Sequence, residues 1–305
     1  MGLVAAWAAA CGEVEGSPDA QRPADAAVAD GAVDAAVAGP CDLGAPFGDI
    51  QRVGGVNTAQ ADEFVSLSPD ELTLYLASNR ADPGTPNLDL YVATRSSRGE
   101  SFSAPVAIDA VNSGSDDRAP EVSADGKALF FHSSRSGGYD VYVSTRANTA
   151  AGFAAPVSVA GVNSADIEGN PGLAADGETL YFGRYTNNVP GVWRATRGPA
   201  GYGSASPVEE INTPNAFWNT TSPDDLAIFF ASDRDGGRGG ADIYVASRAS
   251  RTEPFGHITN VAELNTDKSE SPDWISPDGC RIYFSSDRPG SDGDFDVWQA
   301  SRPAR

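Results

Sequence analysis

The hydrophobic positions of this chain fall in short runs that recur about every fifty residues. From residue 46 onward, each run of apolar and aromatic residues is followed by a polar turn and then by another short run. The aromatic-rich runs stand at residues 74–76, 129–131, 180–182, 228–230 and 282–284. Continuous apolar runs of this length, bounded by Asp, Gly and Pro, are typical of strands covered on both faces. The pattern therefore predicts an all-β domain built from repeated antiparallel units.

Two further positions keep the same register in every unit. An aromatic residue is followed ten residues later by Asn at Phe47/Asn57, Phe102/Asn112, Phe153/Asn163, Tyr202/Asn212 and Phe255/Asn265. Each unit then closes on an arginine, at Arg95, Arg146, Arg197, Arg248 and Arg302, with spacings of 51, 51, 51 and 54 residues. A single four-stranded sheet of this size has two apolar faces and must bury them against its neighbours. Radial stacking of five sheets into a propeller does so and also protects the sheet edges.

The turn sequences resemble a known repeat. Ser68-Pro69-Asp70, Ser276-Pro277-Asp278-Gly279 and the run Phe230-Ala231-Ser232-Asp233-Arg234-Asp235-Gly236-Gly237 are similar to the WD40-like (PD40) repeats of TolB-type β-propellers. The resemblance covers residues 46–305. It implies a propeller fold but not one activity, because the same repeat serves binding proteins, scaffolds and some enzymes. The TolB propeller itself has six such blades and a preceding α/β domain, so its role does not carry over to five repeats.

The order of the repeats predicts how the ring closes. In TolB-type blades the inner strand precedes Ser-Pro-Asp, which makes the aromatic–Asn element the outer strand. Here the first such element, within residues 46–57, comes before the first inner strand, and the last blade stops at its third strand near Arg302. We therefore predict that the N-terminal segment supplies the outer strand of the last blade and closes a five-bladed ring.

Two of the three cysteines test that closure. Cys41 lies just before the predicted outer strand, and Cys280 lies in the first turn of the last blade. Because neighbouring strands alternate in direction, both cysteines fall at the same end of one blade. The inner and outer strands are about 14 Å apart at a strand spacing of about 4.8 Å, and the five residues that follow Cys41 can cross that distance. We predict a Cys41–Cys280 disulfide, with two free thiols as the alternative. A disulfide indicates an oxidising compartment.

The N-terminal region has a different composition. The apolar run at residues 3–10 ends in Ala8-Ala9-Ala10-Cys11, which resembles the lipobox of bacterial lipoproteins with Cys11 as the lipidated residue. No Lys or Arg precedes the run, and a buried cysteine is the alternative. We divide the chain into residues 1–11 as a signal remnant, 12–45 as a disordered Ala/Asp-rich linker and 46–305 as the propeller. This division predicts an extracytoplasmic protein anchored by lipid to the cell envelope, with the outer membrane as one candidate.

Charge narrows the set of partners. The chain has 42 acidic and 21 basic residues, a formal net charge of −21. This balance argues against a nucleic-acid partner and against electrostatic attachment to an anionic membrane, so contact with a membrane is expected only through the lipid anchor. We expect a monomer that recognises a protein or a cell-wall component.

Candidate site residues stand at the start of the inner strands. Four of five units carry an acid eight residues before the turn Asp, at Asp62, Asp117, Glu168 and Glu270, and the fourth unit has Ala216. One hypothesis places these acids at a channel mouth, where they bind a cation, a basic peptide or a polyhydroxylated ligand. The alternative is structural, with each acid paired to an arginine of the repeat. Trp218 and Trp274 would add an aromatic patch to the mouth, or else pack between blades.

These features leave two function classes. The main prediction is a non-catalytic binding or scaffold propeller that uses its axial face, without a catalytic residue, cofactor or metal. The alternative is a glycoside hydrolase or lyase that uses axial carboxylates about 5–9 Å apart. Acids at alternate positions in Asp292-Gly293-Asp294-Phe295-Asp296 resemble the start of a calcium loop, but the distal glutamate of that motif is missing.

Overall fold

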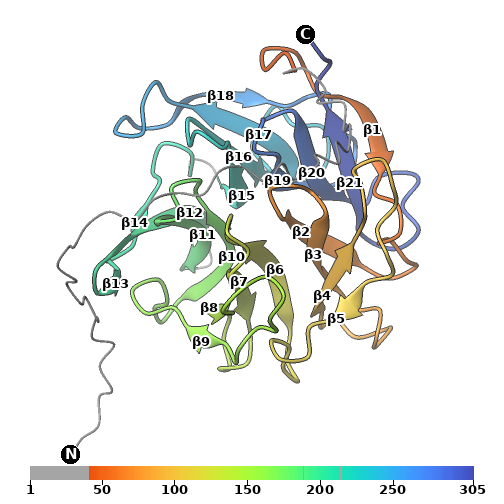
Figure 1. Cartoon of the computed structure of the whole chain (residues 1–305). Coiled ribbons are helices and arrows are strands. Elements are labelled where there is room, and N and C mark those ends of the chain that lie inside the picture. The colour runs from red at the N-terminus through yellow and green to blue at the C-terminus, as the bar shows by residue number, and fades with distance from the viewer. Residues whose placement is uncertain (1–40, 188, 213–214) are drawn as a thin grey trace, which may run out of the picture. The chain divides into compact units, whose positions relative to one another are not determined.

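The computed structural model describes residues 41–187, 189–212 and 215–305, and these residues form an all-β, five-bladed propeller. The predicted fold class is therefore confirmed (Figure 1). Cys11 and most of the predicted linker lie outside the described residues. Among the residues that are described, no helix is long and apolar enough to cross a membrane.

Four of the blades are four-stranded antiparallel sheets, and the third has a fifth, short strand. In each blade the strand that precedes the Asp turn lies innermost (Figure 1). Blade 1 contains β2 (Asp62–Leu67), β3 (Thr73–Ser78), β4 (Asp89–Thr94) and β5 (Val106–Ala107). Blade 2 contains β6 (Asp117–Val122), β7 (Ala128–Ser133), β8 (Asp140–Thr145) and β9 (Val157–Ser158). Blade 3 contains β10 (Ile167–Leu173), β11 (Thr179–Thr186), β12 (Val189–Gly198) and β14 (Ser206–Pro207), and β13 (Gly201–Tyr202) pairs with the end of β12. Blade 4 contains β15 (Phe217–Thr221), β16 (Ala227–Ser232), β17 (Asp242–Ser247) and β18 (Gly256–Asn260).

Blade 5 joins the two ends of the propeller. It contains β19 (Glu270–Ile275), β20 (Arg281–Ser286), β21 (Asp296–Ser301) and the N-terminal strand β1 (Gly48–Arg52). β1 pairs antiparallel with β21, and Figure 1 shows the two strands side by side. Cys41 and Cys280, the predicted pair, are joined by a disulfide with their Cα atoms 5.7 Å apart. The ring is thus closed by strand pairing and by a covalent bond.

The repeated asparagines attach the outer strand of each blade. The Asn57 side-chain amide accepts a hydrogen bond from the Val297 backbone N–H (2.8 Å) and donates one to the Val297 carbonyl (3.0 Å). Asn265 makes the same two bonds to Ile243. A side chain that substitutes for a backbone partner satisfies both groups of the neighbouring strand where regular pairing stops. The asparagine that recurs in all five repeats therefore has a structural role.

The core lies between blades. One cluster joins Val65 and Leu67 of blade 1 to Trp274 and Tyr283 of blade 5, all less than 9% exposed. Arginines also link neighbouring blades: between blades 1 and 2, the Arg146 guanidinium donates to the Tyr75 hydroxyl at 3.0 Å. Burial of aromatic and β-branched residues between sheets is the main stabilising term in such a ring.

Candidate functional site

The four predicted acids do not line an open channel mouth. Asp62, Asp117, Glu168 and Glu270 are fully buried, and each pairs with an arginine of its own blade. The Arg135–Asp117 pair is 2.6 Å long, and the Arg184–Glu168 pair is 2.8 Å long. A hydroxyl group from the preceding loop also donates to each carboxylate, from Thr58, Ser113, Ser164 and Thr266. This geometry matches the structural alternative, in which the acids fasten the loop that enters the inner strand.

Residues beside these acids reach the axis instead. Each inner strand contains a β-bulge, and in four blades the bulged residue has a positive φ: Phe64, Ala119, Asn170 and Trp218. These bulges change the side-chain alternation after the buried acid. The residues of the five bulges surround a narrow axial channel with a volume of only about 20 Å³. The axis is therefore nearly filled by side chains.

A larger hollow opens at the end of the ring where the inner strands begin. We call it the axial funnel; its volume is about 590 Å³. Glu63 and Phe64 of β2, Arg118 of β6, Trp218 of β15 and Asp294 of the β20–β21 loop line it. Glu63, Arg118 and Trp218 each break the repeat, because the other blades carry different residues at the same places. The funnel thus combines an aromatic side chain with charges of both signs.

Charge in the funnel centres on Glu63. Its carboxylate is 8% exposed and lies 3.6 Å from the Arg118 guanidinium. Arg118 is itself held by Asp116 at 2.6 Å and by the Pro86 carbonyl at 2.6 Å. Burial raises the pKa of Glu63 to about 7, against the opposing effect of Arg118. The Glu63 carboxyl group therefore changes charge near neutral pH, while its neighbour, the Arg118 side chain, is held in position by Asp116 and Pro86.

Two more carboxyl groups line the axial channel below the funnel. Glu121 accepts hydrogen bonds from the Ser66 hydroxyl (2.9 Å) and the Leu173 backbone N–H (3.2 Å), and burial raises its pKa to about 7. Asp273 accepts from the Ser285 hydroxyl at 2.5 Å, and burial raises its pKa well above the usual range. Sequence analysis missed both residues. Their signal was available, since neither type recurs at its position in another blade.

The two predicted tryptophans line different hollows. Trp218 is half-buried in the funnel, with its ring 5.8 Å from Phe64 and 4.9 Å from Phe217. Trp274 is 8% exposed in the core between blades 5 and 1, and it lines the mouth at the other end of the channel. The predicted joint aromatic patch is therefore not formed, and Trp274 packs between blades.

The acidic run at residues 292–296 is bound to an arginine. Asp292 and Asp296 both lie 2.7 Å from the Arg52 guanidinium. In the part of the chain that the structure describes, no group of three or more His, Cys, Asp or Glu side chains is arranged to hold a metal ion.

Comparison with known proteins places the fold but not an activity. No protein-family model matches the chain, and no curated protein matches it. Among solved structures, an α-L-arabinofuranosidase from Podospora anserina in complex with cellotriose is 13% identical with a TM-score of 0.56, covering 87% of this chain and 100% of that one. A family 117 glycoside hydrolase from Zobellia galactanivorans is 14% identical with a TM-score of 0.53, covering 87% and 92%. A putative TolB from Agrobacterium tumefaciens is 15% identical with a TM-score of 0.50, covering 80% and 84%.

These likenesses define a class by fold. The chain is a β-propeller whose architecture is shared by TolB-like proteins and by glycoside hydrolases. At such low identity, the site residues must carry any argument about function.

Proposed function

We propose that the protein is an extracytoplasmic binding propeller whose axial funnel recognises a polyhydroxylated cell-wall component. The observation that carries the proposal is the meeting of Trp218, Glu63 and Arg118, from three different blades, around one hollow of about 590 Å³. Hollows of roughly 300–1,000 Å³ with an apolar surface and a few polar groups are typical ligand sites. An aromatic ring offers contact area to the C–H face of a sugar, and the charged pair offers an acceptor and donors to its hydroxyl groups.

The proposed location of the protein is supported by the disulfide and by the N-terminal sequence. A bond between Cys41 and Cys280 favours an oxidising compartment. We propose that Cys11 carries a lipid anchor, that the propeller acts as a monomer, and that its net charge of −21 directs it away from nucleic acids.

A glycoside hydrolase is the second candidate, and Glu63 favours it. A carboxyl group with a pKa of about 7 is a suitable general acid near neutral pH, and Asp294 supplies a second carboxyl group in the same hollow. In this reading, Glu63 protonates the leaving-group oxygen, and the ionised partner activates water or attacks the sugar.

One experiment separates the two candidates. The full chain is incubated with cell-wall preparations and a polysaccharide panel, and both retention and released sugar are measured in the same tube. We expect retention without release, and loss of about tenfold in affinity in Trp218→Ala, since that change removes the aromatic wall of the funnel.

The matched control is Trp193→Ala. Trp193 is another half-buried tryptophan, but it lies on β12 against Arg184, outside the funnel. Its variant should retain the ligand. Sugar release that Glu63→Gln abolishes would establish the hydrolase instead. If the panel shows neither retention nor release, or if both tryptophan variants behave alike, the funnel proposal is wrong.

A further inference from the structure

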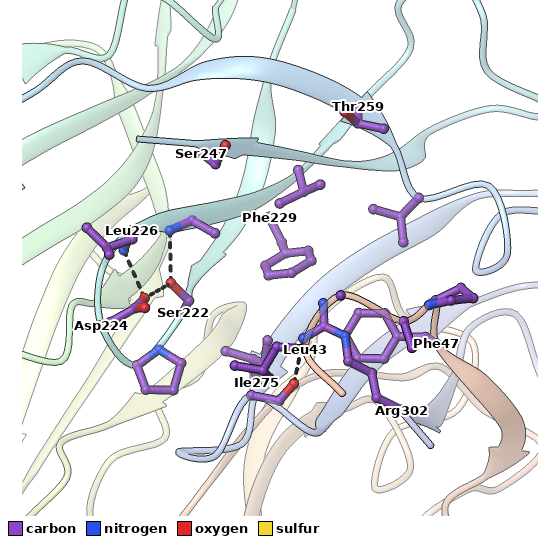
Figure 2. Close-up of a pocket in the computed structure, with 18 of the residues that line it drawn as sticks. Leu43, Phe47, Ser222, Asp224, Leu226, Phe229, Ser247, Thr259, Ile275 and Arg302 are labelled. Atoms are coloured by element: carbon purple, nitrogen blue, oxygen red, sulfur yellow. Dashed lines mark hydrogen bonds between the residues drawn. The ribbon is translucent and has the colours of Figure 1, made fainter. Parts of the chain in front are cut away.

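A cavity of about 680 Å³ lies between blades 4 and 5, away from the axial funnel. We call it the 4–5 groove. Strands β16, β17 and β18 form one wall, and residues 43–47, Ile275 and Arg302 form the other (Figure 2). Its apolar surface comes from Leu43, Phe47, Phe229, Val245, Val261 and Ile275. The groove is therefore mainly hydrophobic, with an arginine at one side.

The neighbouring 5–1 groove uses the same repeat positions with polar residues. Where the 4–5 groove has Ala227, Phe229 and Val245, the 5–1 groove has Arg281, Tyr283 and Gln299, as the strand registers show. Its cavity is smaller, about 310 Å³. The two grooves thus differ in both volume and polarity at matched repeat positions.

In the 5–1 groove a carboxylate meets the repeat arginine. Glu71, from the turn after β2, is fully buried 3.7 Å from the Arg95 guanidinium and accepts a hydrogen bond from Tyr283 at 3.2 Å. Arg95 also donates to the Tyr283 hydroxyl at 3.1 Å. An acid and a phenol thus satisfy the arginine inside the interface.

In the 4–5 groove the corresponding arginine lacks both partners. Gly279 stands at the turn position of Glu71, and Phe229 stands at the position of Tyr283. Arg302 stacks over Phe47 at 4.1 Å and donates from Nη1 to the Gly279 carbonyl, while its buried Nε has no hydrogen-bond partner among the described residues. An unsatisfied guanidinium donor beside an apolar surface is costly and favours an anionic acceptor.

The acids around the groove are already engaged. Asp224 accepts from the Leu226 backbone N–H, Asp278 from the Cys280 N–H and Glu263 from the Phe47 N–H, each at 3.0 Å. Asp224 and Asp278 therefore bind the backbone of their own turns, and Glu263 binds the backbone of the N-terminal segment. None of these carboxylates forms a hydrogen bond with Arg302 in the described part of the chain.

We propose that the 4–5 groove binds a monocarboxylic acid with an unbranched alkyl chain. The carboxylate takes the place beside Arg302 that Glu71 takes beside Arg95. The chain lies over Phe229, Val245 and Val261. Removing the alkyl chain from water supplies most of the affinity, and the arginine fixes the orientation of the ligand.

Dodecanoate and dodecanol, titrated separately into the full chain, test both parts of the proposal by calorimetry. We expect saturable binding of dodecanoate at one site and about tenfold weaker binding of dodecanol, because the alcohol gives up the charge-assisted hydrogen bonds. Gly279→Glu should reduce dodecanoate binding by about tenfold or more, because it places a carboxylate where the ligand's would lie. The new Cβ would stand 3.9 Å from Arg302 Nη1 and 3.0 Å from the flexible end of Leu43.

The matched control is Gly177→Glu. Gly177 occupies the same turn position in blade 3 with the same φ of +68°, and its Cβ would meet nothing within 4 Å. This variant carries the same backbone strain and charge but leaves the 4–5 groove unchanged, so it should bind dodecanoate like the parent. The proposal is overturned by no binding to the parent, by equal binding to folded Gly279→Glu, or by loss of binding in Gly177→Glu. Circular dichroism and thermal unfolding establish that each variant is folded.

Discussion

The two grooves that flank blade 5 place an arginine of the same repeat position in opposite surroundings. In the 5–1 groove, Arg95 belongs to a buried network in which Arg281 donates to Glu71 at 2.7 Å and Tyr283 bonds to both partners. In the 4–5 groove, Arg302 faces an apolar cavity. The stacking beneath the arginine is nevertheless retained, since Arg95 lies 4.3 Å from the Phe102 ring and Arg302 4.1 Å from the Phe47 ring.

The comparison shows that the repeat determines the arginine–aromatic stack and the strand register, whereas single residues determine the polarity of each groove. The arginine–aromatic stack and the strand register are kept on both sides of blade 5. The polar contents of the groove can then change without opening the ring. At the 4–5 groove, the disulfide between Cys41 and Cys280 lies directly beside Gly279 and ties the closing segment to blade 5. One interface thus has a smaller cavity lined by a polar network, while the other has a larger, mainly apolar cavity beside a covalent bond.

The largest effect is expected from Glu71→Gln. This change removes the negative charge that faces Arg281, Arg95 and Arg98 inside the 5–1 groove. Breaking a buried pair by removing one partner leaves uncompensated charge, so we expect the free energy of unfolding to fall by about 3 kcal/mol. Urea denaturation measures this loss.

Glu263→Gln is the control on the other side of blade 5. Glu263 is exposed and accepts one backbone hydrogen bond, from Phe47. We expect it to cost less than about 1 kcal/mol. Equal losses in the two variants would contradict the contrast between a buried ionic groove and an apolar one.

A second, smaller effect concerns a carboxyl group without a basic partner. Among the residues that the structure describes, Glu121 accepts hydrogen bonds only from Ser66 and the Leu173 backbone, and burial raises its pKa to about 7. A raised carboxyl pKa means that the folded state holds the proton more tightly than the unfolded chain. Stability from this group is therefore present below pH of about 4.5 and is lost as the pH rises to about 7. Glu121 thus differs from Glu71 in its partners, since Glu71 lies within 4 Å of three arginines.

Glu121→Gln tests whether ionisation of Glu121 lowers the stability of the folded protein as the pH rises. A neutral side chain keeps an acceptor for both donors and does not ionise, so the variant should match the parent at pH 5 and exceed it by about 2 kcal/mol at pH 8. Urea unfolding at the two pH values gives the difference. Burial raises the pKa of Glu63 and of Asp273 in the same direction, so the variant should flatten the pH dependence without removing it. Parallel curves for variant and parent would show that Glu121 is not the titrating group.

The fold was predictable because the sequence pattern of one blade occurs five times in the chain. Each copy repeats the aromatic, Asn, turn and arginine positions, and the displaced first copy indicated that residues 46–57 belong to the last blade. The same displacement placed Cys41 near Cys280. Long-range pairing of β1 with β21 followed from counting repeats rather than from local preference.

The axial site was not predictable in the same way. The pairing of a repeat acid with a repeat arginine, such as Asp62 with Arg80, was one of two alternatives, and the sequence alone did not choose between them. The bulges were also hidden, because a register shift at Phe64 or Trp218 depends on backbone pairing rather than on hydrophobic pattern. Phe64 and Trp218, which lie at these bulges, line the funnel, and Glu63 stands directly before one of them. Positions at which one blade differs from the others, such as Glu63 and Trp218, were the sequence feature that could have indicated the axial site.

The smallest effect is expected from a substitution that makes the 4–5 groove resemble the groove between blades 1 and 2. Phe229→Tyr adds a hydroxyl where Tyr75 carries one in the groove between blades 1 and 2, and there the turn position is also a glycine, Gly126. We expect the new hydroxyl to accept a hydrogen bond from Arg302 and to raise the free energy of unfolding by about 1 kcal/mol. The reverse change, Tyr75→Phe, should lower it by about the same amount, and urea unfolding measures both.

The pair of variants also tests whether Arg302 is poised for a partner. Arg146 bonds its own turn carbonyl through Nε and reaches Tyr75 through Nη2, whereas Arg302 bonds its turn carbonyl through Nη1. If Tyr75→Phe destabilises while Phe229→Tyr gains nothing, the rotated guanidinium does not accept the repeat geometry. If Phe229→Tyr gains stability and also weakens dodecanoate binding, the hydroxyl and the carboxylate compete for one guanidinium. The 4–5 groove is then a repeat interface whose missing phenol leaves its arginine available to a ligand.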